Sequence, residues 1–232
     1  MSATATQNQP AAPEINTQPT PQSDPIALIL KVAWMAIVLG FVMQILASAA
    51  AWIGGKEPQL KEFLAEGAAK ISWSTIVCVG LALGTAASKM RTESTGLAGF
   101  LAAPAGFIAA RTTQKSTSQA FGMTAPAAIA TGIFVTILLL KAAEYASLGA
   151  LLARLGEKPK ATLGSFLGVG LMIGLLFGTV ILLVFYYGGV QAGKPMPTPR
   201  LLAQAVNEIV FPIGCSFVIY ASGAFAKRFA NA

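Results

Sequence analysis

The chain has 232 residues, of which 55% are hydrophobic and only 11% are charged, and it contains no histidine. A water-soluble domain carries about a quarter charged residues, so this composition excludes an ordinary soluble fold and indicates an integral membrane protein. The net charge of +7 does not indicate a nucleic-acid partner, because the basic residues stand singly or in pairs between apolar stretches.

Residues 1–25 form a polar segment rich in Ala, Thr, Gln, Pro and Asn, with only two charged residues. Such a composition cannot bury enough apolar surface to fold, so we expect a disordered tail. The first apolar stretch, residues 26–53, is long enough to cross a bilayer, because about 20 helical residues span a hydrocarbon core of about 30 Å. Residues 26–232 are therefore expected to form one transmembrane helical domain.

The next segment is expected to divide into two helices. Residues 58–67 alternate apolar and charged positions at helical spacing, which is typical of a short helix lying in the membrane interface. A second crossing is expected at about residues 71–88, before a basic stop.

Two stretches, residues 95–110 and 120–140, each contain an Ala-Pro-Ala centre, at Pro104 and at Pro126. Proline removes one helical hydrogen bond and clashes with the preceding turn, so both prolines are candidate hinges or path-lining residues. The first stretch is weakly hydrophobic and is interpreted either as a crossing or as a re-entrant segment. Residues 111–119 between the stretches are expected to form a polar loop.

Residues 141–160 alternate charged and leucine positions and are expected to form a second interfacial helix, with Lys141 and Glu144 paired toward the headgroups. Two further crossings follow, at about residues 163–187 and 206–226, separated by a proline-rich loop.

The sequence thus predicts an all-α, polytopic transmembrane helical bundle of about six crossings, or of five plus a re-entrant hairpin. Residues 26–91 and 163–228 share one order of features and place Cys78 on Cys215 at an offset of 137, so duplicated halves are one interpretation and shared membrane composition is the other. If the halves are symmetric, the two cysteines should approach each other at mid-membrane. With the N-terminus inside, six crossings place nine basic residues inside and seven outside, whereas five crossings reverse the split, so the positive-inside rule favours six. The pattern of Lys and Arg fits a bacterial inner membrane with both termini cytoplasmic, and an organelle membrane is the alternative.

Glycines four residues apart predict close helix packing on two segments, because small residues let helix backbones approach. They are Gly164, Gly168, Gly170, Gly174 and Gly178 on the fifth crossing, and Gly80 and Gly84 on the second. The packing partner is either another helix of this chain or another subunit.

Asn207 and Glu208 precede Pro212 near the start of the last crossing. An ionisable group inside a membrane is costly and is by default a candidate for a transport pathway. If the crossing begins at residue 209, however, Glu208 lies only at the interface. These three residues are candidate path-lining or hinge positions.

No histidine, no paired carboxylates within one segment and no phosphate-binding loop are present, so the sequence indicates no enzyme, no cofactor and no metal site. The expected function is that of a subunit or self-assembling scaffold of a larger membrane complex. Its partners would be the lipid bilayer and either other membrane subunits or further copies of the chain. The alternative is a small homo-oligomeric channel or permease whose proline-broken helices line the path.

Overall fold

A computed structural model describes residues 25–86, 91–126 and 129–229. This part of the chain is all-helical and has no strand; its helices are α1 (Pro25–Ile53), α2 (Leu60–Ala86), α3 (Arg91–Ala120), α4 (Thr131–Gly156), α5 (Leu163–Gln191) and α6 (Thr198–Phe229). The predicted polar tail, residues 1–25, lies outside the described residues except for Pro25, which begins α1.

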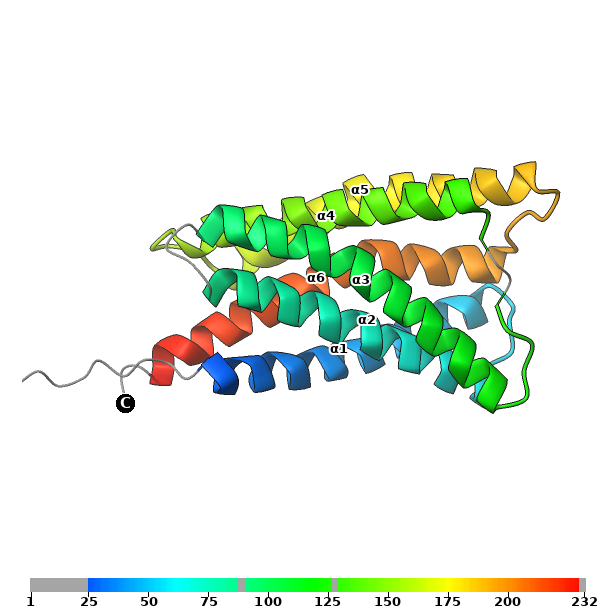
Figure 1. Ribbon diagram of the computed structural model, residues 1–232, viewed down its shortest axis with the longest axis horizontal. Coiled ribbons are helices and arrows are strands. Elements are labelled where there is room, and N and C mark those ends of the chain that lie inside the picture. The colour runs from blue at the N-terminus through cyan, green and yellow to red at the C-terminus, as the bar shows by residue number, and fades with distance from the viewer. Residues whose placement is uncertain (1–24, 87–90, 127–128, 230–232) are drawn as a thin grey trace, which may run out of the picture.

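The six helices run alternately up and down, so that α1, α3 and α5 point one way and α2, α4 and α6 the other (Figure 1). Each helix contacts the helix that follows it in the chain, and α6 contacts α1, which closes the set into a ring. Helices α2 and α4 also contact α6, so these three helices form the inner layer of the bundle. The first helix begins and the last helix ends at the same end of the bundle, which we call the terminal end (Figure 1). We call the opposite end, where the two cavities described below lie, the open end.

Five of the helices, all except α3, are long and apolar enough to cross a membrane. Together with α3 they confirm the predicted helical membrane bundle of about six crossings. Helix α3 is continuous over 30 residues and contains Pro104 without reversing direction, so the re-entrant alternative for residues 95–110 is not observed. A helix of that length extends about 45 Å, enough to carry its polar last turns beyond the hydrocarbon.

Three of the expected boundaries were wrong for one physical reason. Residues 111–119 continue α3 instead of forming a loop, and residues 131–156 form one helix instead of a crossing and an interfacial segment. Residues 60–67 and 71–86 belong to the single helix α2, and residues 87–88 lie outside the described residues. Charged and polar side chains on these helices find partners on neighbouring helices, so they do not end the crossing. Ser72 of α2 and Thr113 of α3, for example, lie 3.1 Å apart at their hydroxyl oxygens.

Pro126 is also placed differently from the expectation. The predicted crossing over residues 120–140 begins only at Thr131, and Pro126 lies in the connection between α3 and α4. Among the three candidate prolines, Pro104 and Pro212 are the ones inside helices.

The two cysteines meet in the core, as the symmetric interpretation predicts. The Sγ atoms of Cys78 on α2 and Cys215 on α6 lie 3.4 Å apart, and both side chains are buried. Helices α2 and α6 run in the same direction (Figure 1). Their outer neighbours differ, however, because α1 contacts both α2 and α6 whereas α5 contacts α6 and α4. The corresponding helices of the two segments therefore occupy different environments.

The predicted glycine contacts are largely internal to the chain. A Cβ added at Gly170, Gly174 or Gly178 would meet the α6 backbone at 2.7 Å, 2.3 Å and 2.9 Å respectively. A Cβ at Gly80 or Gly84 would meet α3 at 2.5 Å and 2.7 Å. By contrast, Gly164 and Gly168 are exposed, and an added Cβ would meet no atom of another helix within 4 Å.

Candidate functional site: a buried ion cluster below an open cavity

The most unusual feature of the interior is a cluster of three buried ionisable side chains, Lys141 and Glu144 from α4 and Glu208 from α6. Lys141 and Glu208 each lie ten residues after the first residue of their helix, which places both about 15 Å from the open end. Their exposed fractions are 3% and 2%, and that of Glu144 is 0%. Lys141 and Glu144 are therefore buried within the bundle and do not face the headgroups as expected, and Glu208 is buried beside them.

Lys141 links the two carboxylates. Its Nζ donates to Glu144 Oε2 at 2.8 Å and also to Glu208 Oε2. The ammonium group also lies 5.4 Å from the ring centre of Trp73 and 5.6 Å from that of Tyr145, within range of cation–π attraction. The helices α2, α4 and α6 thus all contribute to the surroundings of one cation.

The two carboxylates are satisfied to different extents. Glu208 Oε1 accepts hydrogen bonds from Gln204 Nε2 at 2.7 Å and from Asn207 Nδ2 at 3.4 Å. Glu144 Oε1 is buried and has no hydrogen-bond partner among the described residues. Buried polar atoms are nearly always paired, so this oxygen sets Glu144 apart from Glu208.

Two residues shape α6 around Glu208. Pro212 lies four residues after Glu208, and since proline has no N–H, the Glu208 carbonyl cannot accept its usual helical hydrogen bond. Gly178 of α5 faces this carbonyl, because an added Cβ would lie 2.9 Å from the oxygen. The absence of a side chain on Gly178 therefore lets α5 approach the backbone that carries Glu208.

A cavity of about 580 Å³ extends from the open end down to this cluster. Both Lys141 and Glu208 line it, together with Trp73, Gln204 and Asn207. Of its charged lining residues, five are basic and two acidic: Lys70, Arg111, Lys141, Lys194 and Arg200, against Glu66 and Glu208. The cavity thus has a formal charge of +3.

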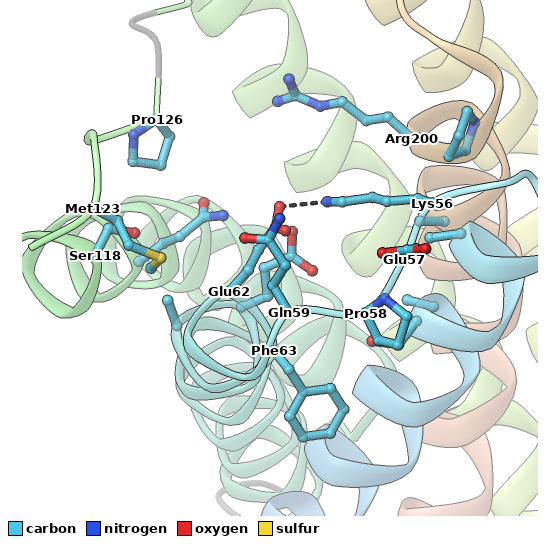
Figure 2. Close-up of a pocket in the computed structure, with 18 of the residues that line it drawn as sticks. Lys56, Glu57, Pro58, Gln59, Glu62, Phe63, Ser118, Met123, Pro126 and Arg200 are labelled. Carbon is cyan, nitrogen blue, oxygen red and sulfur yellow. Dashed lines mark hydrogen bonds and ion pairs between the residues drawn. The ribbon is translucent and has the colours of Figure 1, made fainter. Parts of the chain in front are cut away.

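A wider cavity of about 900 Å³ lies beside it at the same end and shares Glu66, Gln114 and Arg200 with it. Figure 2 shows this outer cavity, with the Lys56–Glu62 ion pair of 2.5 Å on one wall and the Arg200 side chain extending across the space. Pro126 and Met123 of the α3–α4 connection line its other side. We call the two adjoining cavities together the vestibule; its inner part reaches the ion cluster.

The bundle is closed between the cluster and the terminal end by buried apolar side chains. They include Leu81 from α2, Leu148 and Leu152 from α4, Phe166 from α5 and Val218 from α6. The Phe166 ring also packs edge-on against Tyr220 at 5.2 Å between ring centres. In the described part of the chain, the cavities thus lie at the open end, and the side of the cluster toward the terminal end is packed with apolar side chains.

Of the sequence-predicted residues, Asn207 and Glu208 meet at the cluster, and Pro212 lies one turn away. Pro104 lines neither cavity, and Pro126 lines only the outer one. Sequence reasoning missed the roles of Lys141 and Glu144, because a charge at the end of an apolar run resembles a membrane boundary. The signal that identifies them is that apolar helical spacing continues beyond them through Leu148 and Leu152.

Comparison of the chain with protein families, with curated proteins and with solved structures gives no match.

Proposed function

We propose that this protein is a permease for a small anionic solute, with its solute site in the cavity of 580 Å³. The observation that carries the proposal is that a cavity open at one end of the membrane bundle reaches a buried Lys–Glu–Glu cluster at mid-depth. A site near the membrane midplane that is accessible from one side is the arrangement that alternating-access transport requires.

The cost of the cluster supports a functional role. Ion pairs at mid-membrane are expensive, and well-packed apolar side chains usually stabilise a buried position at least as well. A chain selected only for packing would gain nothing from Lys141, Glu144 and Glu208. Intramembrane charges of this kind generally mark a solute or ion pathway.

The charge of the cavity supports the solute class. Its formal charge of +3 favours an anion, and the guanidinium groups of Arg111 and Arg200 suit bidentate binding of a carboxylate or phosphate. The volume lies in the range of ordinary small-molecule sites.

The subunit or scaffold function expected from the sequence is the second candidate. Three of its five glycines on α5 are used against α6 within the chain, which weakens it. Gly164 and Gly168 remain on the outer face of α5, and these two positions are what favours a partner helix.

For the location we propose a bacterial inner membrane with both termini cytoplasmic. Since Lys141 lies inside the bundle, the basic residues divide into eight at the terminal end and seven at the open end. With this orientation the vestibule opens to the outside, so the structure would represent a permease open to external solute. Fusions of a reporter active only in the cytoplasm, at residue 232 and in the connection of residues 121–130, test the orientation.

Solute binding is tested by thermal unfolding of the full chain in detergent with a panel of small anions. Inorganic phosphate, acetate, succinate and a phosphate ester are compared with choline and with uncharged sugars. We expect at least one anion to raise the midpoint temperature in the wild type and not in Arg200→Gln, with uptake of that anion by proteoliposomes. Stabilisation only by cations, or by anions to the same extent in Arg200→Gln, would refute the anionic site.

A further inference from the structure

The ion cluster carries a net charge when all three of its side chains are ionised. Lys141 contributes one positive charge and Glu144 and Glu208 contribute two negative charges, so the fully ionised cluster carries −1. An uncompensated charge inside a membrane protein is energetically costly, and a buried group avoids this cost by changing its protonation. One proton makes the cluster neutral.

The hydrogen bonds indicate which carboxyl holds this proton. Glu208 accepts from Lys141, Gln204 and Asn207, and three donors stabilise a carboxylate. Glu144 accepts only from Lys141, through Oε2, and its Oε1 has no partner among the described residues. Because few donors stabilise a carboxylate at Glu144, the neutral acid is the favoured form of this side chain.

We propose that the cluster binds one exchangeable proton on Glu144 and that this proton couples solute transport, so that the permease is a proton–anion symporter. The transport part rests on the proposed function, whereas the proton site stands on the cluster itself. On release, the Glu144 O–H bond breaks and Glu144 becomes a carboxylate, and the proton leaves through the Glu208 side of the cluster to cavity water, which becomes hydronium. Lys141 keeps its charge, so the cluster changes from neutral to −1.

The titratable groups around Glu144 come from three helices. Lys141 and Tyr145 belong to α4, and Glu208 and Cys215 belong to α6, with Cys78 of α2 beside Cys215. Lys141 and Glu208 are the ones that line the cavity, so the cluster exchanges its proton through the side where Glu208 lies. A deprotonated cluster repels an anion in the cavity, and a protonated one does not. Anion and proton therefore strengthen each other's binding, which is the linkage that symport needs.

The test is infrared spectroscopy of the full chain in lipid at neutral pH, read at the carbonyl stretch of a protonated carboxylic acid and verified by its shift in D2O. We expect one such band in the wild type, its loss in Glu144→Gln, and its loss in Glu208→Gln, where Glu144 must ionise to balance Lys141. In Lys141→Met both carboxyls become protonated, and the band should grow about twofold. The exposed Glu157→Gln serves as the matched control and should leave the band unchanged.

Thermal unfolding of the same variants locates the proton. Glu144→Gln copies the protonated acid and should unfold at the wild-type temperature, whereas Glu208→Gln should unfold earlier, because it leaves three donors with a poorer acceptor. A wild type without the band, a band that persists in Glu144→Gln, or a Glu144→Gln chain less stable than Glu208→Gln would overturn the proposal. If anions bind but the band is absent, the permease stands and the proton coupling fails. If the band is present but no anion binds, the proton site stands and the anionic solute fails.

Discussion

Replacing Gly174 by alanine tests the contact between α5 and α6 that positions the ion cluster. The added Cβ would lie 2.3 Å from the Ile209 carbonyl oxygen and 3.1 Å from its carbonyl carbon. Both are backbone atoms, so a side-chain rotation cannot relieve the overlap and α6 must move away. Overpacking of this kind costs about 1–3 kcal/mol, and we expect the upper part of that range because the obstacle is a helix backbone. Since Ile209 follows Glu208, the same movement should disturb the ion cluster.

Gly168→Ala is the matched control, because it lies on the same helix and an added Cβ there would meet no atom within 4 Å. Alanine favours a helix over glycine by about 1 kcal/mol at either position, so this gain cancels in the comparison. The two variants should therefore differ by the steric cost alone, measured as the free energy of unfolding in mixed detergent micelles. Equal stability of Gly174→Ala and Gly168→Ala would refute the close α5–α6 contact.

Three further predictions concern the interior. Lys141→Met should destabilise the chain by about 3–5 kcal/mol in an unfolding titration at neutral pH, because it breaks a buried ion pair and Glu208, without its cation, must take up a proton. Adding Glu144→Gln and Glu208→Gln should recover most of the loss, and a triple variant as unstable as the single one would contradict this. Treatment with a membrane-permeant oxidant should join Cys78 and Cys215 within one chain, since their Sγ atoms lie 3.4 Å apart. Mass spectrometry of the digested protein should then show the linked peptides, whereas dimers linked between chains would contradict the contact. Pro212→Ala should weaken anion binding in the thermal assay, because it restores a helical hydrogen bond to the carbonyl of Glu208. Pro104 lines neither cavity, so an equal loss of binding in Pro104→Ala would mean that the effect is not local.

Helices α2 and α4 show why the sequence alone did not predict their bounds correctly. A charged residue after an apolar run is normally a membrane boundary, because an isolated charge is costly in lipid. Here Lys70 lies inside α2 because its Nζ donates to Gln44 Oε1 on α1 at 2.7 Å. Lys141 lies inside α4 because it pairs with Glu208 of α6, which is 67 residues further along the chain. A hydropathy pattern carries no information on such partners from other helices, so the predicted helix boundaries differ from those in the structure.

The glycines illustrate the same division on the scale of packing. Their spacing predicts that backbones approach, since this depends only on small residues recurring on one helix face. Which helix approaches depends on the closed ring of six, in which α5 lies against α6 and α2 lies against α3.

The sequence alone determined that this chain is an all-helical membrane protein of about six crossings, because the length and apolar content of a span are properties of a continuous segment. It also singled out Glu208, since one acidic residue in an apolar run is visible without a structure. The tertiary structure decided that Glu208 shares Lys141 with Glu144 at the floor of a cavity. That arrangement depends on contacts between α4 and α6, and the long-range pairing of charges in a low-dielectric interior leaves no periodic trace along either helix.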